Sequence, residues 1–304
     1  MIPQGWLRRG LIWLPFLWLA LFFLLPLLVV AGIGFAESAD TIPPYAALIT
    51  RTSAGLESQA TLDNYRELAR SCLLAYGNSL GLAAFAAALC LLIGYPIAFA
   101  ISRAPGFWRQ LLLFFVVLPF WTSFLIRVYA WIAILQPSGL LNRLLLAAGL
   151  IDAPLPLLYN GFAVELGLVY SYLPFMILPL YGSLARLDES LVEAAADLGA
   201  RPWRVFVQVI LPLTVPGIAA GCLLVFIPAV GEFVIPDLLG GPSTVMVGKL
   251  LWQEFFDNVD WPVAAAMAVA LVVVLTLPLL LAQRFVDPGN GPQGPSVRGE
   301  GEPA

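Results

Sequence analysis

The sequence predicts an all-α integral membrane protein with six transmembrane helices. Of its 304 residues, 61% are hydrophobic and only 11% are charged, and the mean hydropathy is +0.91. A soluble domain of this size would need more charged side chains to cover its core. A helix crosses the apolar core of a bilayer with about 20 residues. Six apolar stretches are long enough, and they cover residues 11–35, 74–101, 111–135, 162–185, 213–237 and 262–285.

The first stretch follows Arg8 and Arg9, as the apolar core of a secretion signal does. It is longer than the roughly 7 to 15 residues of such a core, and no clear cleavage site follows it. We therefore expect it to remain as a membrane anchor. In the long loop after it, the segment TLDNYRELAR predicts a short amphipathic helix lying flat on the membrane surface, with Thr61 or Asp63 as its cap.

The distribution of basic residues predicts that both termini are cytoplasmic, because short positively charged loops stay on that side. With this orientation the inner segments carry nine arginines. The outer segments carry five basic and eleven acidic residues, so the outer face should attract cations. The expected domains are a cytoplasmic N-terminus at 1–10, a six-helix domain at 11–285 with an inner loop at 186–212, and a disordered cytoplasmic tail at 286–304.

Composition excludes several kinds of site. The chain has no histidine, which removes imidazole metal ligands and histidine-based catalytic triads. Its cysteines, Cys72, Cys90 and Cys222, have no metal-like spacing and are interpreted as small core residues. We therefore expect no metal site and no catalytic residue. The phosphate-binding pattern GxxxxGK[ST] is also absent, so ATP hydrolysis, if it drives this protein, takes place in a partner.

The inner loop between the fourth and fifth stretches predicts two short helices that meet at a glycine. Asp188 or Ser190 is the expected cap of the first helix, and Ser190 with Glu193 has the spacing of a capping box. Gly199 should end this helix, and Pro202 suits the first turn of the next one. From spacing alone, two interpretations stay open: an ordinary loop resting on the membrane, or a surface that contacts another protein.

The same loop resembles the EAA signature of binding-protein-dependent ABC importer permeases. The resemblance rests on Glu193-Ala194-Ala195, Gly199, Val209 and Leu211-Pro212 at the family's spacing, with valine at 209 where isoleucine is usual. It extends over about residues 11–285 and is closest to putrescine and spermidine permeases, as in LPFWTSFLIRVYAWIAIL and FIPAVGEFVIPDLLGG. The resemblance implies a MetI-like permease bundle and a non-catalytic subunit in the bacterial inner membrane. It also implies contact with an ATPase through Glu193, Ala194, Ala195, Asp197, Leu198 and Gly199.

The family resemblance implies several partners. They are a cytoplasmic ABC ATPase dimer that uses ATP and magnesium, a second homologous permease subunit, and an extracytoplasmic polyamine-binding protein. The chain itself is expected to bind no cofactor and no nucleic acid.

A path for a diamine needs acidic groups for its charges and aromatic faces for its methylene stem. The candidate path residues are Trp121, Tyr129, Glu165, Tyr172, Glu232 and Asp237. Arg127 and Glu232 both lie in apolar stretches, where charge is costly. They are interpreted either as an ion pair that holds helices together or, for Glu232, as part of the cation path. For any single aromatic residue, packing or anchoring at the lipid interface is the alternative role.

Two other functional classes compete with this interpretation. An ion-coupled secondary transporter would explain the charges within the membrane but not the inner loop. A membrane-embedded enzyme would need a clustered nucleophile, base or metal site, which the sequence does not offer. Within the importer class, spermidine or another cation is the alternative cargo.

Overall fold

The chain is almost entirely helical. The computed structural model describes residues 13–52, 55–242 and 244–286. Within these residues six helices are long and apolar enough to cross a membrane, which confirms the predicted number. They are Trp13–Ile33, Asp63–Arg103, Phe124–Ala147, Gly161–Leu184, Pro202–Val230 and Trp261–Leu281. The predicted N-terminal segment 1–10 lies outside the described residues, as does the predicted tail 286–304 apart from Val286, the last residue of α14.

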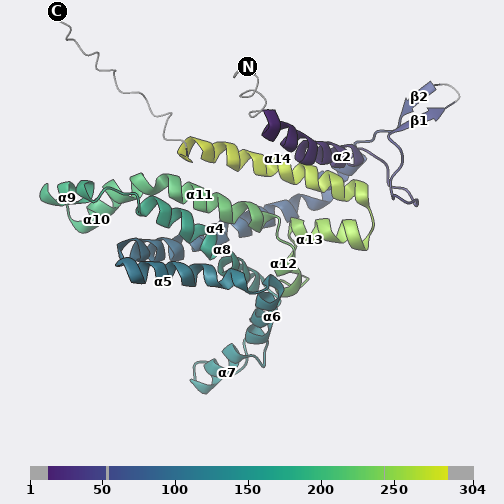
Figure 1. Cartoon of the computed structure of the whole chain (residues 1–304). Helices are drawn as coiled ribbons and strands as arrows, with labels where there is room; N and C mark the ends of the chain where they lie inside the picture. The colour runs from purple at the N-terminus through teal and green to yellow at the C-terminus, as the bar shows by residue number, and fades with distance from the viewer. Residues whose placement is uncertain (1–12, 53–54, 243, 287–304) are drawn as a thin grey trace, which may run out of the picture. The chain divides into compact units, whose positions relative to one another are not determined.

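The elements form a single series along the chain (Figure 1). In order they are η1 (Ala20–Leu24), α2 (Leu25–Ile33), β1 (Ile49–Thr52), β2 (Gly55–Ser58), α3 (Asp63–Glu67), η2 (Leu68–Cys72), α4 (Leu73–Arg103), α5 (Gly106–Val117), η3 (Leu118–Trp121), α6 (Phe124–Leu135), α7 (Leu140–Ala147), α8 (Gly161–Leu184), α9 (Glu189–Asp197), α10 (Pro202–Val205), η4 (Phe206–Ile210), α11 (Leu211–Val230), α12 (Val234–Leu239), α13 (Val247–Trp252), η5 (Gln253–Asp257) and α14 (Trp261–Val286). The turn η3 is a 3₁₀ helix, and the other η segments are π-helical turns. β1 and β2 form an antiparallel hairpin in which Ile49 is opposite Ser58.

These elements pack into two compact units. The first contains the described residues up to Gly81, together with 159–161 and 230–275. The second contains residues 82–158 and 162–229 and the described residues from Thr276 onward. The helices α4, α8, α11 and α14 contribute residues to both units.

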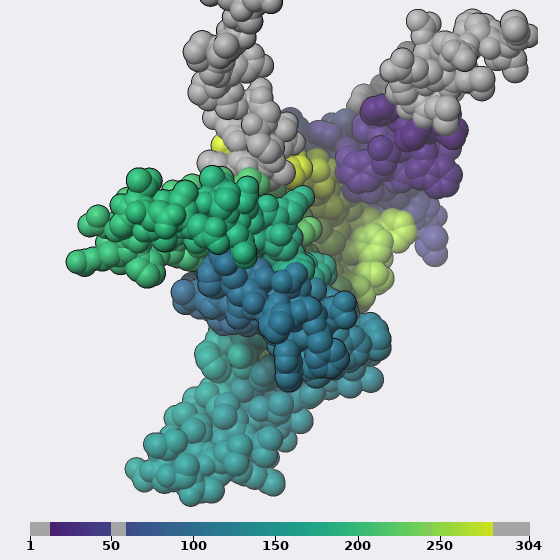
Figure 2. Space-filling model, turned by 60° about the vertical axis from the view of Figure 1, so that its left-hand side comes forward, coloured from purple at the N-terminus to yellow at the C-terminus, as the bar shows by residue number. Residues whose placement is uncertain are grey.

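The core of the second unit is formed by α4, α8 and α11, which pack closely (Figures 1 and 2). At Gly94 of α4, an added Cβ would lie 3.1 Å from Met176 and 3.3 Å from Ile177 of α8. The hydroxyl groups of Tyr95 on α4 and Thr214 on α11 are hydrogen-bonded at 3.0 Å. Small residues where helices cross therefore allow the backbones to approach, as in other membrane bundles.

The third apolar stretch is not the single helix predicted over 111–135. α5 ends at Val117, the 3₁₀ turn η3 follows with Pro119 in its first turn, and the backbone at Thr122 is extended, with ψ of 148°. α6 begins only at Phe124. Apolar composition alone does not reveal this break, because the residues on both sides of it are apolar.

Beyond α6 the chain turns into the short helix α7. The side-chain NH₂ of Asn142 donates to the carbonyl oxygens of Gln136 (3.3 Å) and Leu155 (3.0 Å), and its oxygen accepts from the Leu155 N–H at 2.8 Å. Asn142 is fully buried, so its amide satisfies backbone groups that would otherwise lack partners.

The first unit is held together by hydrogen bonds from side chains to backbone. The Tyr76 hydroxyl donates to the carbonyl oxygen of Met267 on α14 at 2.7 Å, and the Val247 N–H donates to the Ser79 hydroxyl at 2.7 Å. The amide of Asn64 donates to the carbonyl oxygens of Gly34 and Ala36 at 3.0 and 2.8 Å. These bonds attach the start of the second span to the end of the first span and to α13 and α14.

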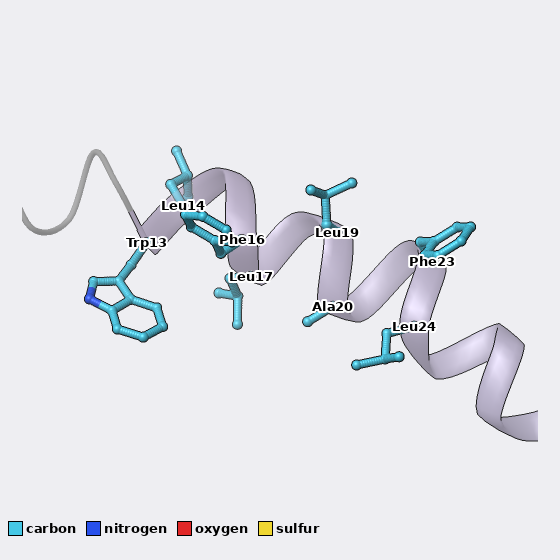
Figure 3. A pocket seen from close by; sticks show the side chains of 8 residues that line it. All are labelled: Trp13, Leu14, Phe16, Leu17, Leu19, Ala20, Phe23 and Leu24. Atoms are coloured by element: carbon cyan, nitrogen blue, oxygen red, sulfur yellow. The ribbon is translucent and has the colours of Figure 1, made fainter. Parts of the chain in front are cut away.

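The first span, Trp13–Ile33, exposes its side chains to the surroundings. None of the residues in its most apolar window is buried. A hollow along this helix is lined by eight of the helix's own residues, which point in several directions around it (Figure 3). A helix that is apolar on every side is suited to contact with lipid.

Two other boundaries differ from the predictions. The helix predicted at TLDNYRELAR exists, but α3 continues through η2 into α4, so it is the first part of a helix running from Asp63 to Arg103 and not a separate surface helix. The Thr61 hydroxyl accepts from the Asp63 N–H at 3.1 Å just before it. The fifth span begins at Pro202 and ends at Val230, earlier than the predicted 213–237.

Candidate functional site

The inner loop folds as the predicted pair of short helices, α9 and α10. Asp188 has extended backbone angles, and its carboxylate accepts a hydrogen bond from the Ser190 N–H at 3.0 Å. Of the two predicted caps the structure thus uses Asp188, because Ser190 already lies inside the helix. The hydrogen bond from the backbone of Ser190 lowers the pKa of the Asp188 carboxyl.

Gly199 ends α9 in the predicted way. Its φ is +81°, in the left-handed region that glycine adopts without steric cost. The Gly199 N–H donates to the carbonyl oxygen of Ala196 at 2.9 Å, and the Ala200 N–H donates to that of Ala195 at 3.1 Å. This pair of bonds is the Schellman motif, which turns the chain sharply after a helix. Pro202 then occupies the first turn of α10, as predicted.

The residues of the EAA motif are accessible on this helix pair. Glu193, Ala194, Asp197, Leu198 and Gly199 are exposed, and Ala195 is half-buried. Large apolar side chains accompany them: Leu198 is 89% exposed and Trp203 is 60% exposed. Figures 1 and 2 show α9 and α10 at one end of the second unit. An exposed apolar surface outside the membrane spans is typical of a protein interface.

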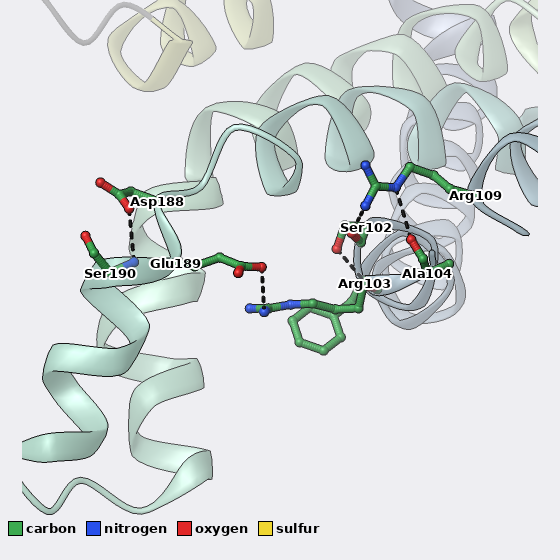
Figure 4. A network of polar contacts seen from close by, with 8 residues as sticks. Ser102, Arg103, Ala104, Arg109, Asp188, Glu189 and Ser190 are labelled. Carbon is green, nitrogen blue, oxygen red and sulfur yellow. Dashed lines mark hydrogen bonds and ion pairs between the residues drawn. The ribbon is translucent and has the colours of Figure 1, made fainter. Parts of the chain in front are cut away.

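An ion pair that the sequence did not predict links this helix pair to α4. Arg103 at the end of α4 contacts the Glu189 carboxylate at 3.2 Å, and its guanidinium also lies 5.5 Å from the ring of Phe99 (Figure 4). Nearby, Arg109 donates to the carbonyl oxygens of Ala104 and Ser102 at 3.2 and 3.3 Å. No sequence signal joins Arg103 to Glu189, because 86 residues separate them.

Four of the six candidate path residues lie in the second unit, and they differ in environment. Trp121 and Tyr129 are 73% and 57% exposed, whereas Glu165 and Tyr172 on α8 are 8% and 9% exposed. Both carboxylate oxygens of Glu165 are buried and have no hydrogen-bond partner among the described residues. The structure thus separates two exposed aromatic residues from two buried polar ones.

Arg127 lies in the same unit, on α6. Its Nε and Nη1 atoms are buried without a hydrogen-bond partner in the described part of the chain. The guanidinium carbon lies 5.6 Å from the ring centre of Phe124 and 5.9 Å from that of Phe120. Cation-π contact with these rings stabilises its charge.

The other two candidates, Glu232 and Asp237, lie in the first unit. Glu232 is not inside the fifth span as predicted, because α11 ends at Val230 and Glu232 lies in the turn before α12. Its carboxylate accepts from the Val234 N–H at 3.0 Å. Asp237 forms an ion pair with Lys249 at 3.3 Å. The Arg127 to Glu232 ion pair would join residues of different units, and it stays a prediction.

A series of aromatic rings in the first unit was not predicted. Phe233 stacks on Trp252 at 4.4 Å, and Trp252 lies 4.1 Å from Phe256. Phe255 in turn contacts Phe256 at 4.8 Å and stacks on Trp261 at 5.2 Å. The density of aromatic residues in LWQEFFDNVDWP was a signal that could have indicated it.

Comparison with known proteins places these features in a family. Residues 91–291 match the family described as "Binding-protein-dependent transport system inner membrane component". The spermidine/putrescine transport system permease protein PotB of Haemophilus influenzae is 42% identical over 88% of this chain and 90% of its own length. PotB of Escherichia coli is 41% identical over 88% of this chain and 93% of its own.

Solved structures show the same fold. A bacterial alginate ABC transporter, crystallised in complex with an alginate pentasaccharide-bound periplasmic protein, contains a chain that superposes with a TM-score of 0.65 at 19% identity, covering 93% of this chain and 94% of its own. Fold similarity at this identity indicates architecture and leaves the cargo open.

Proposed function

The chain belongs to the family of binding-protein-dependent transport system inner membrane components, and on this premise we propose that it is a permease subunit of an ATP-driven importer of polyamines, of the putrescine type. The observation that carries the proposal is 42% identity to a spermidine/putrescine permease across 88% of the chain. As a family member with six membrane helices, it is a multi-pass protein of the bacterial inner membrane. In this role it catalyses no reaction and forms half of the translocation path.

The proposed cargo is a cation with an aliphatic stem. The acidic outer segments and the buried Glu165 support a positive charge, and the aromatic candidates support a methylene stem. The relatives' names include both spermidine and putrescine, so the choice of putrescine is the narrower part of the proposal.

The proposed energy source is a cytoplasmic ATPase dimer that docks on α9 and α10 and uses ATP and magnesium. Support comes from the exposed EAA residues and from the apolar side chains of Leu198 and Trp203 beside them. A second permease subunit would complete the path, and an extracytoplasmic binding protein would deliver the cargo. A periplasmic protein is bound to the alginate importer of similar fold, in agreement with this assembly.

Uptake into vesicles tests the cargo. The transporter, reconstituted with its ATPase, second permease and binding protein, should accumulate labelled putrescine only when ATP is inside the vesicles and the binding protein is outside. Labelled spermidine in parallel distinguishes the two polyamines. Accumulation driven by an ion gradient in vesicles that hold this chain alone would favour a secondary transporter and contradict the proposal.

Substitution of Gly199 tests the coupling. Alanine should destabilise the turn by about 1–2 kcal/mol because an L side chain resists the left-handed conformation, while a Cβ at this position would meet nothing within 4 Å. We expect Gly199→Ala to reduce ATP-driven uptake and binding-protein-stimulated ATP hydrolysis together. Gly199→Asn is the matched control, because asparagine tolerates this conformation. Equal activity of both variants would show that the turn is not needed for coupling.

A further inference from the structure

Glu165 is the buried acidic side chain of the second unit that the fold leaves unsatisfied. It lies in the second turn of α8 and is 8% exposed. Neither of its carboxylate oxygens has a hydrogen-bond partner among the described residues. The candidates of the first unit differ in this respect, since Glu232 accepts from the Val234 N–H and Asp237 pairs with Lys249.

Neither protonation state of Glu165 is satisfied by the protein as it stands. An ionised carboxylate needs hydrogen-bond donors on both oxygens, and a protonated one has an O–H that needs an acceptor. A buried polar group without partners is costly in either form, and buried charges in proteins are paired. The position is therefore incomplete without a further group.

The surroundings of Glu165 on α4 are small side chains. The Cys90 thiol lies 3.7 Å from the carbonyl oxygen of Val169, and Gly94 lies against Met176 and Ile177, so α4 and α8 run parallel here. One helical turn earlier on each helix brings Glu165 level with Ala86 and Ala87. Both alanines are buried, at 0% and 6% exposure. Methyl groups at this level offer no hydrogen bond and leave the carboxylate to an incoming ligand.

Arg127 is too far along the bundle to be that partner. Its guanidinium lies beside Phe120, and Phe120 contacts Phe175 on α8 at 5.1 Å between ring centres. Phe175 is ten residues beyond Glu165, which is about 15 Å along the helix axis. The cation for Glu165 therefore comes from outside this unit's own side chains.

The chemistry of the position selects a primary ammonium group. One carboxylate matches one positive charge, and three N–H donors suit two acceptor oxygens. A divalent metal needs about six or more oxygen ligands or a set of nitrogen and sulfur ligands, and the described residues contain no group of three side chains able to hold one. Tyr172, seven residues further on the same side of α8 and also buried, places an aromatic residue along the helix where a methylene stem would lie.

We propose that Glu165 is a membrane-embedded binding residue that pairs with an ammonium group of an aliphatic polyamine as it passes through the subunit. The inference rests on the proposed function for the class of cargo. It assigns a single carboxylate among the six candidates as the one that the bare protein leaves for the ligand.

Carboxyl labelling tests occupancy directly on the full purified chain in detergent micelles, without any transport partner. A hydrophobic carbodiimide modifies buried carboxyl groups, and the modified residue is located by mass spectrometry. We expect putrescine to slow modification of Glu165, whereas 1,4-butanediol and sodium chloride at matched ionic strength should not. Equal modification of Glu165 with and without putrescine would overturn the proposal.

Transport kinetics provide the second test in the reconstituted complex. Glu165→Gln keeps the size of the side chain and removes its charge, so the KM for putrescine uptake should rise about tenfold or more, as loss of a buried charged hydrogen bond implies. Glu165→Asp should restore part of the affinity because it keeps the carboxylate. Glu67→Gln, at an exposed carboxylate outside the candidate path, is the matched control and should behave as the wild type.

The two proposals fail in different ways. A wild-type complex that carries no polyamine contradicts the proposed function. A wild-type complex that carries putrescine, together with a Glu165→Gln variant of unchanged KM, contradicts only the role of Glu165. A variant that lowers the maximal rate and the thermal stability but leaves KM unchanged would show a structural role and would also overturn the proposal.

Discussion

At the scale of single residues, the closest helix contact in the second unit depends on two glycines of α11. A Cβ at Gly217 would meet the Ser183 side chain and lie 2.9 Å from the carbonyl oxygen of Pro179. A Cβ at Gly221 would lie 2.7 Å from the Met176 sulfur. The two glycines are four residues apart in GIAAG, so they share one face of α11 against α8.

We predict that Gly217→Ala destabilises the protein by about 1–3 kcal/mol, the usual cost of overpacking, because the helices must separate to admit the methyl group. Gly182→Ala is the control on α8, since a Cβ there meets nothing within 4 Å. The control should be neutral or slightly stabilising, as alanine favours helix more than glycine does. Thermal unfolding in detergent micelles measures both, and a Gly217→Ala variant as stable as its control would refute the close packing.

At the scale of elements, α9 depends on its cap because a helix of nine residues is marginal in water. Asp188→Ala removes the acceptor for the Ser190 N–H, whereas Asp188→Asn retains an oxygen in the same place. We expect the alanine variant to lose ATP-driven uptake and the asparagine variant to keep it. Uptake that is lost in both would assign the effect to the charge of Asp188, contrary to this prediction.

The pH dependence of this cap follows from the pKa of Asp188. The Ser190 N–H lowers that pKa, so the carboxylate stabilises the folded helix above the unfolded pKa and this contribution is lost as pH falls through the lower, folded value. The cap should therefore be complete throughout the neutral range, and lowering the pH from 8 to 6, about two units above the ordinary carboxyl pKa, should leave coupling at this helix unchanged. Uptake measured across that range in the wild type and the Asp188→Asn variant checks the expectation.

The elements also show where sequence reasoning succeeded and where it stopped. Apolar length predicted six spans, and glycine and proline predicted the ends of α9 and α10, because these signals are local. The pairing of Arg103 with Glu189 and the burial of Glu165 depend on contacts between distant segments, which spacing along the chain does not contain. The break at Thr122 was missed because apolar length says nothing about backbone direction.

At the scale of the whole molecule, the orientation in the membrane is a prediction from arginine placement. It is tested in a variant that lacks Cys72, Cys90 and Cys222, with single cysteines introduced at Ser190 or at Asp152. A membrane-impermeant maleimide added to intact cells should label the cysteine at 152 and should reach the cysteine at 190 only after the cells are opened. The reverse pattern would place α9 outside and remove the basis for contact with a cytoplasmic ATPase.

The interruption between α5 and α6 has a consequence for the neighbours of this chain in the bilayer. Thr122 and Ser123 leave the helical hydrogen-bonding pattern, and Thr122 bonds only back to Pro119, through its N–H at 3.3 Å and its hydroxyl at 2.8 Å. Acyl chains offer no donors or acceptors to a peptide group that has left its helix, and irregular backbone at membrane depth is found against protein or water. This side of the chain is accordingly turned away from the fatty-acid tails, either toward another polypeptide or toward a hydrated passage.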